Sequence, residues 1–329
     1  MIIARAPMRI SYVGGGSDYK DFFTGHKGNV VGTTINQYVY VFLNQLSEIA
    51  PENFRFTYRK TESVQKVTDF DHPVLRETLQ MLGVNKKLNI GTFSELPSGV
   101  GLGGSSAFTV ALIKILKAYS GSYPNAHELA ELAILVEREI LKESGGVQDQ
   151  YHAAFGGFRH YSFQESDVAV SEPLISSQSM EYISSRQILV WVGEPRLSSK
   201  FAAVTESNLQ RQLKYVTAAS ELALSTANLL SKSVLPRENF LDLIDSVRVG
   251  WDLKQQYAEE SHESVHKIIG KASRAGGKAF KLCGAGGTGF VLVLAEIEDI
   301  PEIISTLNGF SIIHPRITET GTSILHEEW

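Results

Sequence analysis

The order of apolar and polar positions predicts a chain of mixed strands and helices. Residues 36–46 form a β-branched and aromatic run. Phe54, Phe56 and Tyr58 alternate with polar residues, the period of two that is typical of a half-buried strand. Further along the first half, the pattern predicts a helix at 73–82, a strand at 88–93, helices at 105–119 and 126–143, and extended segments around 162 and at 187–193.

The second half begins with helical patterns and ends with strands. It is expected to hold helices at 199–231, 237–258, 262–275 and 301–308, and strands at 289–295 and 311–317. Because strands and helices mix without a regular βαβ alternation, the pattern predicts an α+β fold. A chain of 329 residues, at roughly 150 residues per domain, predicts about two domains. We expect the division near residue 180, which gives domains 1–180 and 181–329.

Composition narrows the function classes. With 43% apolar and 20% charged residues, the chain can bury a core, which excludes wholesale disorder. The net charge is −5 and the chain has no run of basic residues, so it lacks the basic surface typical of a nucleic-acid-binding protein. With a single cysteine, Cys283, the chain cannot form a disulfide framework. The first residues lack a signal-peptide pattern, and no apolar run approaches the roughly 20 residues of a membrane span. We therefore expect a cytoplasmic protein without membrane or nucleic-acid partners.

The segment Gly99-Val-Gly101-Leu-Gly103-Gly104 matches the dinucleotide-binding glycine pattern. That fold needs a second parallel strand after the helix, whereas two helical patterns follow here, so a dinucleotide site is rejected. The loop instead leads into a helix at Ser105 and Ser106. Backbone N–H groups at such a helix start form a phosphate cradle, and the hydroxyls can donate to phosphate or bind magnesium. The alternative is a glycine-rich turn capped by serine.

A second glycine-rich segment, Gly284-Ala-Gly286-Gly-Thr-Gly289, fits the phosphate-loop pattern of protein kinases. It lies at the wrong end of the chain, and no His-Arg-Asp or Asp-Phe-Gly follows it. A protein-kinase fold is therefore excluded. A Walker A motif is also absent, because no glycine-rich loop ends in Gly-Lys-Ser/Thr.

A third segment is predicted to be an edge strand that runs into Gly14-Gly15-Gly16 and then Asp18. Such a hairpin can hold a polyol, with Asp18 accepting hydrogen bonds from its hydroxyls. A plain turn in which Asp18 caps the following residues explains the segment equally well.

Glu137 is difficult to explain as a surface residue. It lies on the apolar stripe of Ala130, Ile134 and Leu141 and has no basic residue three or four positions away. An unpaired carboxylate in apolar surroundings costs several kcal/mol. Glu137 is therefore interpreted as a metal-binding or catalytic group, with a tertiary salt bridge as the alternative.

Asp149 follows the flexible turn at Gly145 and Gly146. The local sequence favours a helix N-cap, and a general base that acts on a substrate hydroxyl is the alternative. The stretch His262-Glu-Ser-Val-His266 matches the zinc-protease pair, but it lacks a third ligand at the expected spacing. We interpret it as a solvated helix face.

Taken together, these segments resemble the GHMP small-molecule kinases. The family's three motifs occur in order at 6–19, 97–107 and 281–290, and Glu137 and the stretch 146–150 connect them. The chain is most similar to the D-glycero-α-D-manno-heptose 7-phosphate kinases of this family. The resemblance implies an N-terminal domain like ribosomal S5 domain 2, a ferredoxin-like C-terminal domain and an active site between them.

The resemblance also implies ATP and Mg²⁺ as cofactors. The ATP-binding residues would be Pro97, Gly99, Gly101, Leu102, Gly103, Gly104, Ser105, Ser106 and Ala107. Magnesium would be held by Ser105 and Glu137, Asp149 would be the catalytic base, and Arg9 would steady Asp149. The substrate-binding residues would be Gly15, Gly16, Ser17, Asp18, Arg196, Lys281, Gly284, Ala285, Gly286 and Gly287, of which Lys281 and Arg196 would hold a phosphate on the acceptor.

The function implied is an ATP-dependent sugar kinase. It would phosphorylate the anomeric hydroxyl of D-glycero-D-manno-heptose 7-phosphate to give the 1,7-bisphosphate. Two alternatives stay open: another sugar kinase of the family, acting on fucose or galactose, and a non-catalytic regulator that binds sugar and ATP. The partner is a small sugar or sugar phosphate, and a homodimer is compatible with the sequence.

Overall fold

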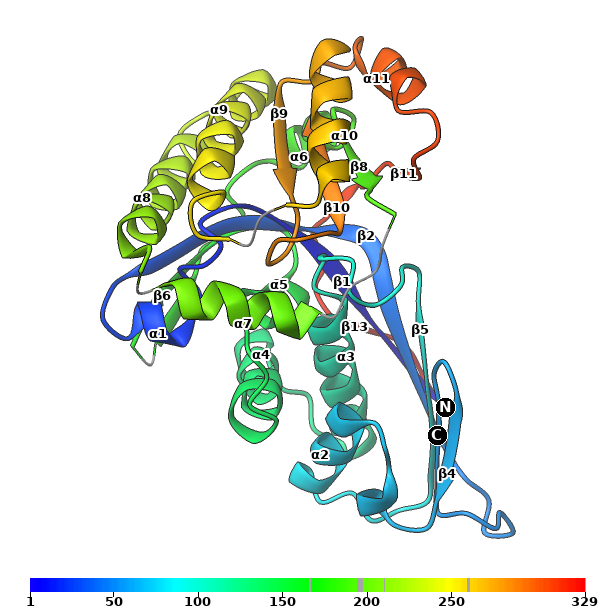
Figure 1. Cartoon of the computed structure of the whole chain (residues 1–329). Coiled ribbons are helices and arrows are strands. Elements are labelled where there is room, and N and C mark those ends of the chain that lie inside the picture. Colours follow the sequence, from blue (N-terminus) through cyan, green and yellow to red (C-terminus); the bar gives the residue numbers. More distant parts are fainter. Residues whose placement is uncertain (166, 194–197, 210, 259–260, 329) are drawn as a thin grey trace.

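The computed structural model describes the chain except residues 166, 194–197, 210, 259–260 and 329 (Figure 1). Its strands are β1 (Ile2–Val13), β2 (Gly28–Gln45), β3 (Phe54–Thr57), β4 (Thr61–Val64), β5 (Leu88–Ser94), β6 (Phe158–Gln164), β7 (Asp167–Val170), β8 (Gln187–Trp191), β9 (Ala279–Leu282), β10 (Phe290–Leu294), β11 (Ile312–Ile313), β12 (Ile317–Thr318) and β13 (Ser323–Glu327). Its helices are α1 (Lys20–Phe23), α2 (Pro73–Met81), α3 (Gly104–Tyr119), α4 (Ala126–Ile134), α5 (Gln148–Phe155), α6 (Ser177–Ser184), α7 (Ser198–Leu209), α8 (Leu213–Leu230), α9 (Pro236–Lys254), α10 (Glu263–Arg274) and α11 (Ile300–Thr306), with a 3₁₀ turn at Val67–Asp69 and a π-helical segment, η2, at Leu135–Ile140. The α+β prediction is confirmed.

The first sheet has the strand order β13-β1-β2-β5-β3-β4, and β6 and β12 also pair with β2. The sequence predicts an edge strand in the segment that begins at Arg5. From Ala6 to Val13, β1 pairs with β2 alone among the described strands, as that prediction has it. Ala4 of β1 lies opposite Val41 of β2 on one side and Ile324 of β13 on the other. The last strand of the chain thus covers β1 over Ile2–Arg5, its first residues.

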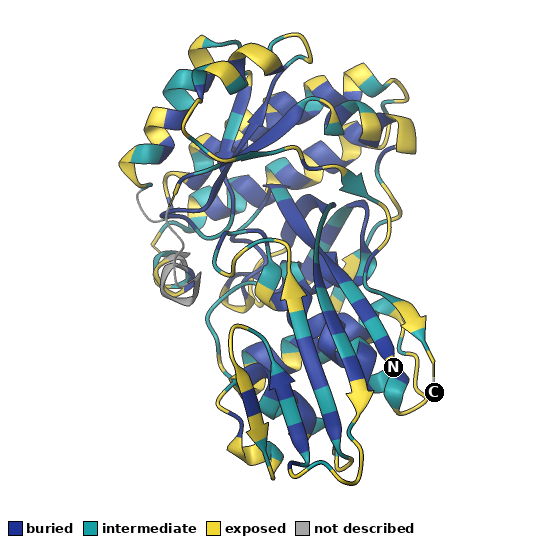
Figure 2. Ribbon diagram, turned by 90° about the vertical axis from the view of Figure 1, so that its right-hand side faces the viewer, coloured by how far each residue is buried: buried dark blue, intermediate teal, exposed yellow. Residues whose placement is uncertain are grey.

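Helices cover one face of the first sheet. α3 packs on β1 and β2 and also contacts α2, α4 and α5, so residues 108–113 are buried on every side of the helix. Figure 2 shows the opposite face of the sheet, where buried positions alternate with intermediate and exposed ones. This alternation is the period of two expected for a sheet with one covered face. The start of α3 is thereby fixed against the sheet, beside β1.

The second sheet has the order β11-β8-β10-β9, and its pairings are antiparallel. Numbered along the chain, these four strands lie in the order 4-1-3-2. Helices α7 to α10 connect β8 to β9, and α11 connects β10 to β11. This is the ferredoxin-like arrangement that the resemblance implies, with extra helices in its first connection. Two helices of that connection, α8 and α9, also pack against β2 and β1 of the first sheet.

The domain boundary near residue 180 stays a prediction, and the two sheets each contain strands from the last part of the chain. β12 and β13 lie in the predicted second domain but pair with β2 and β1 of the first sheet. One hydrophobic core also joins residues such as Ile10 and Val31 to Ala223 and Phe240. The predicted helix at 199–231 is two helices, α7 and α8, and the predicted helix at 126–143 continues past residue 134 as η2. Within the described part of the chain, no helix combines the length and apolarity needed to cross a membrane.

Candidate active site

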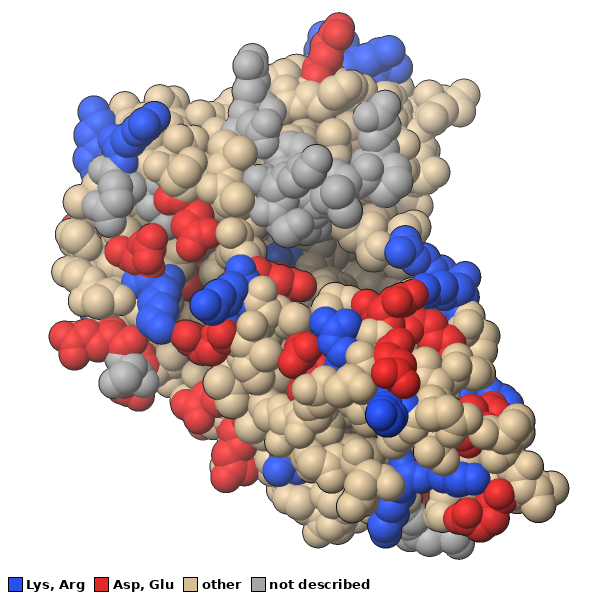
Figure 3. Space-filling view, turned by 60° about the horizontal axis from the view of Figure 1, so that its bottom comes forward, with Lys and Arg blue, Asp and Glu red and all other residues tan. Residues whose placement is uncertain are grey.

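A cavity of about 340 Å³ lies between the two sheets, at the N-terminal ends of α3 and α5. Figure 3 looks onto the hollowed face of the molecule, where basic and acidic side chains gather around the depression. The cavity is lined by Arg9, Ser11, Gly15, Gly16, Asp18, Tyr19, Pro97, Ser98, Gly99, Val100, Gly101, Gly103, Gly104, Ser105, Ser106, Glu137, Arg138, Glu143, Ser144, Gly145, Gly146, Gln148, Asp149, Ala202, Lys254, Tyr257, Ala258, Lys281, Gly284 and Ala285.

The loop between β5 and α3 follows the backbone path of a phosphate cradle. Gly99, Gly101 and Gly103 have φ values of 80°, 83° and 74°, a region that side chains with a Cβ rarely adopt. Gly103 is the N-cap of α3 and offers no side chain to the first N–H groups of the helix. These N–H groups have no acceptor inside the helix and carry the positive end of its dipole. The loop therefore fits the phosphate chain of a nucleotide.

The 284–289 turn packs against the back of this loop. A Cβ on Gly101 would lie 2.6 Å from the carbonyl oxygen of Cys283, and a Cβ on Gly289 would lie 2.9 Å from that of Val100. The two glycine-rich loops thus touch backbone to backbone, which explains the glycines at positions 101 and 289. Gly284 lines the cavity beside this contact.

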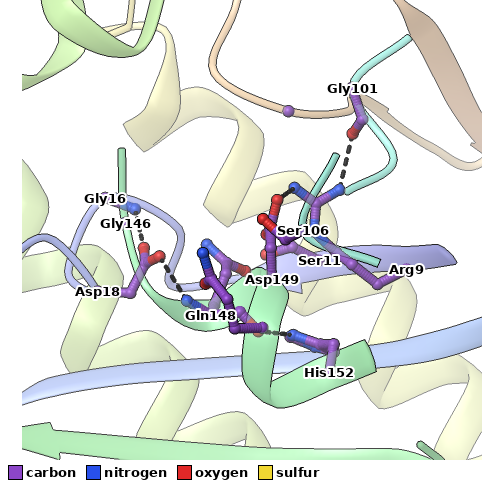
Figure 4. Close-up of polar contacts among 12 residues, drawn as sticks. Arg9, Ser11, Gly16, Asp18, Gly101, Ser106, Gly146, Gln148, Asp149 and His152 are labelled. Atoms are coloured by element: carbon purple, nitrogen blue, oxygen red, sulfur yellow. Dashed lines mark hydrogen bonds and ion pairs between the residues drawn. The ribbon is translucent and has the colours of Figure 1, made fainter. Parts of the chain in front are cut away.

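Arg9 and Asp149 form an ion pair inside the cavity (Figure 4). Arg9 donates from Nε and Nη2 to the two oxygens of Asp149, at 2.8 and 2.9 Å, and from Nη1 to the carbonyl of Gly101 at 2.7 Å. A Cβ on Gly103 would lie 3.3 Å from Asp149 Oδ2, so the carboxylate lies beside the start of α3. Asp149 is the second residue of α5, and Val147 is its N-cap, so the N-cap interpretation is wrong.

Glu137 is a buried and fully hydrogen-bonded carboxylate, 1% exposed. It accepts hydrogen bonds from Ser106 Oγ at 2.9 Å, from Gln150 Nε2 at 2.6 Å and from the Thr109 hydroxyl. Arg138 Nη1 lies 3.5 Å from Glu137 Oε2. The salt bridge that was the alternative interpretation of Glu137 is therefore also present. π-helical turns occur often at functional sites, and η2 is the turn that carries Glu137.

The structure distinguishes the two serines at the start of α3. Ser106 is buried and contacts Glu137, whereas Ser105 lines the cavity from an exposed position. The serine beside Glu137 is therefore Ser106 and not the Ser105 of the sequence prediction.

Asp18 closes the cavity on the side of the glycine hairpin. It accepts hydrogen bonds from the backbone N–H groups of Gly16 at 3.0 Å and Gln148 at 3.2 Å. Burial raises the pKa of Asp18, and the nearby Asp149 raises it further. A Cβ on Gly146 would lie 1.8 Å from Asp18 Oδ2, which explains the glycine at that position.

Two buried lysines, Lys281 on β9 and Lys254 at the end of α9, hold the cavity wall. Lys281 donates from Nζ to the carbonyls of Ser11 at 2.6 Å and Tyr12 at 2.7 Å. Burial lowers its pKa to about 8. Lys254 donates from Nζ to the carbonyl of Leu282 at 2.8 Å and to the carbonyl of Gly284, two residues later. Both ammonium groups thus tie neighbouring backbone segments together at the cavity.

Most residues predicted for the site line this cavity. The predicted residues that do not line it are Ser17, Leu102, Ala107, Gly286 and Gly287. Leu102 and Ala107 are buried in the core, and Ser17 donates to the carbonyls of Gly14 and Asn29 within the hairpin. Arg196 lies outside the described residues.

Nine of the cavity residues carry polar side chains for which the sequence predicted no role: Ser11, Tyr19, Ser98, Arg138, Glu143, Ser144, Gln148, Lys254 and Tyr257. Arg138 and Gln148 are direct neighbours of predicted site residues, and that adjacency is the signal available in the sequence. Tyr257 donates from its hydroxyl to the carbonyl of Gly15, a contact between distant segments that no local pattern indicates.

The two histidines of the His262-Glu-Ser-Val-His266 stretch are exposed, as predicted for a solvated helix face. His262 is the N-cap of α10, and its Nδ1 accepts a hydrogen bond from the N–H of Ser264. Among the described residues, no cluster of three histidine, cysteine or acidic side chains is placed to bind a metal.

Comparison with known proteins gives the family. The model for the N-terminal domain of GHMP kinases matches residues 68–157, and the model for their C-terminal domain matches 232–308, together half of the chain. D-glycero-alpha-D-manno-heptose 7-phosphate kinase of Campylobacter jejuni is 27% identical over 308 residues, 90% of this chain and 89% of the relative. Galactokinase of Thermotoga maritima is 26% identical over 323 residues, 89% of each chain.

Solved structures agree on the fold. The crystal structure of a D-glycero-D-manno-heptose 1-phosphate kinase from Bacteroides thetaiotaomicron superposes with a TM-score of 0.81, at 21% identity over 100% of both chains. The structure of Lactococcus lactis galactokinase with galactose superposes with a TM-score of 0.76, at 13% identity over 98% of this chain and 94% of that one. With both domain models matched in order and the fold shared over its whole length, the chain belongs to the GHMP kinases.

Proposed function

We propose that this GHMP kinase transfers the γ-phosphate of ATP to the anomeric hydroxyl of D-glycero-D-manno-heptose 7-phosphate and produces the 1,7-bisphosphate. The observation that carries the phosphotransfer is the position of Asp149, which Arg9 holds beside the glycine-rich start of α3. The Campylobacter jejuni relative, similar over nine-tenths of the chain, supports the choice of acceptor.

The phosphates of ATP would lie along the loop 99–103 and on the first N–H groups of α3. Ser106 and Glu137 present a hydroxyl and a carboxylate at one point of the cavity wall, the oxygen ligands that Mg²⁺ prefers. These two residues would hold the ion, and its charge would neutralise the phosphate oxygens. Ser105, at its exposed position, would donate to a phosphate.

Asp149 would accept the proton of the acceptor hydroxyl. That oxygen then bonds to the γ-phosphorus, the bond from the γ-phosphorus to the bridging oxygen breaks, and ADP leaves with the electron pair. Arg9 fixes the carboxylate through two N–H groups, so the base is oriented before the sugar binds. This geometry suits a general base, because the carboxylate of Asp149 stays in place while it takes one proton from the hydroxyl.

The acceptor would lie against the glycine hairpin, where Asp18 and the backbone at Gly15 and Gly16 face the cavity. Lys281 would bind the phosphate of the acceptor. Its ammonium group has three N–H donors, of which Ser11 and Tyr12 take two, so one is left for a phosphate oxygen.

ADP release with Mg·ATP tests the proposal and its two alternatives. The acceptors compared are heptose 7-phosphate, the same heptose without phosphate, galactose and fucose. We expect the fastest release with heptose 7-phosphate. Fastest release with galactose or fucose would support another sugar kinase, an alternative that the 26% identity to galactokinase favours. Binding of sugar and ATP without any ADP release would indicate the regulator.

A further inference from the structure

Gln148, the residue before Asp149, carries a buried oxygen that has no partner. Its side chain lines the cavity, the residue is 8% exposed, and Oε1 makes no hydrogen bond to any described residue. More than nine-tenths of buried polar groups in proteins are paired, and leaving one unpaired destabilises the fold. We therefore expect Gln148 Oε1, which lies beside the proposed base, to accept a hydrogen bond from a group of the bound ligand.

The orientation of the Gln148 amide follows from its neighbour. The side chain donates a hydrogen bond to Asp18, in addition to the one from its backbone N–H. Because a carboxylate accepts hydrogen bonds, the NH₂ group of Gln148 must face Asp18, and Oε1 must point away from it. Figure 4 shows the Gln148 side chain between Asp18 and Asp149.

A second unpaired group converges on the same space. Ser11 lies two residues after Arg9 on β1, and its Oγ is buried without a partner among the described residues. A Cβ on Gly15 would lie 3.6 Å from both Ser11 Oγ and Gln148 Nε2. The Ser11 hydroxyl and the NH₂ group of Gln148 thus both lie close to the Gly15 backbone, and Oε1 is the other end of the same amide. All three residues line the cavity.

We propose that Gln148 and Ser11 form a subsite for a second hydroxyl of the acceptor, on the carbon next to the one that is phosphorylated. Gln148 Oε1 accepts the hydrogen bond of that hydroxyl, and Ser11 Oγ completes its coordination. This inference rests on the proposed function. Gln148 and Asp149 are consecutive in the first turn of α5, so their side chains reach two neighbouring positions of one ligand. For an anomeric acceptor, the second hydroxyl is the one at carbon 2.

The test measures the dissociation constants of heptose 7-phosphate and its 2-deoxy analogue, by calorimetry with ADP and Mg²⁺ present. Wild type is expected to bind the 2-deoxy analogue about 10- to 100-fold more weakly, because the analogue leaves Oε1 unpaired. In Gln148→Met, a change of similar volume, this preference should shrink to within about threefold. Ser11→Ala removes a single oxygen and should reduce the preference as well. Gln80→Met, the same change at an exposed position of α2, should preserve it.

The outcomes separate this subsite from the kinase reaction. An equal preference in wild type, Gln148→Met and Ser11→Ala would overturn the subsite, and so would a wild type that binds both sugars equally. A preference that collapses in the two variants, together with no ADP release from any sugar, would support the subsite and contradict the phosphotransfer. Because Ser11→Ala is a small change, a misfolded Gln148→Met still leaves a variant that decides between these results.

Discussion

Arg9 and Asp149, 140 residues apart in the chain, are joined by two parallel hydrogen bonds of 2.8 and 2.9 Å. The same guanidinium donates to the carbonyl of Gly101. One arginine on β1 therefore sets the position of the carboxylate on α5 relative to the loop that precedes α3. One planar side chain thus holds three segments together and keeps Asp149, the proposed base, beside the proposed phosphate cradle.

The first prediction concerns Asp149→Asn. The amide keeps the volume of the side chain but cannot accept a proton, so kcat should fall by about 10²- to 10⁴-fold. Nucleotide affinity should stay within about threefold, because no phosphate contact is assigned to this side chain. ADP release and nucleotide binding measure the two effects.

Asp245→Asn, the same change at a side chain that is 79% exposed, should leave both quantities unchanged. A turnover of Asp149→Asn within tenfold of wild type would contradict the assignment of the base.

The second prediction concerns Glu137→Gln. The amide has one acceptor oxygen in place of two, and its NH₂ group must face Ser106, Thr109 or Gln150, which all donate to the carboxylate. The Mg²⁺ concentration for half-maximal rate should rise about 10- to 100-fold. A magnesium titration at saturating ATP measures this shift, and urea unfolding checks that the variant is folded.

Glu143 provides the matched control, because it is an acidic residue of the same cavity without contact to Ser106 or Thr109 in the described structure. Glu143→Gln should leave the magnesium titration within about threefold of wild type. Equal shifts in the two variants would indicate a general charge effect of the cavity and would contradict the ligand role of Glu137.

Local sequence was sufficient for those features of the site that depend on neighbours in the chain. The glycine-rich loop, the helix that follows it and the inward direction of Glu137 all follow from spacing within about 15 residues. The choice between Ser105 and Ser106 did not follow from it. Adjacent helix residues point about 100° apart, so the answer depends on which face of α3 meets Glu137.

Other features depend on contacts that no local pattern contains. The sequence predicts no basic partner for Glu137, because in a regular α-helix its neighbours are the residues three and four positions away. The chain is π-helical there, and Arg138, the next residue, forms the ion pair instead. The first residues of β1 pair with β13, about 320 residues later in the chain, as with Ala4 and Ile324.

The third prediction concerns the contact between the two glycine-rich loops. Gly101→Ala must adopt a φ of 83° and would place a Cβ 2.6 Å from the carbonyl oxygen of Cys283. Strain of about 1–3 kcal/mol is expected from the backbone alone, and displacement of the loop should weaken ATP binding further. Urea unfolding and nucleotide binding measure the two effects.

Gly121→Ala separates strain from the loop contact. Gly121 has a φ of 75°, and a Cβ there meets no atom within 4 Å. This variant should lose stability through backbone strain and keep its nucleotide affinity. If Gly101→Ala binds ATP as tightly as Gly121→Ala does, the loop does not hold the phosphates.

The fourth prediction concerns His152, a buried histidine in α5. Its Nδ1 donates to the carbonyl of Gln148 at 2.8 Å, its ring packs 4.4 Å from that of Tyr161, and its Nε2 has no partner among the described residues. Burial lowers the pKa of His152 from 6.5 to about 4. Between these values the unfolded chain binds a proton that the folded protein does not. The contribution of His152 to the free energy of unfolding is therefore fully present above about pH 6.5 and falls by up to about 3 kcal/mol as the pH drops toward 4.

Urea unfolding at about pH 7 and about pH 4.5 measures this loss of stability, and His152→Gln should reduce it by about half. A remaining slope is expected, because burial also lowers the pKa of His160 to about 4. The exposed His266 provides the control, and His266→Gln should leave the acid slope at its wild-type value. The same slope in wild type and His152→Gln would show that the ring accepts a proton without cost in the folded state, which its burial against Tyr161 contradicts.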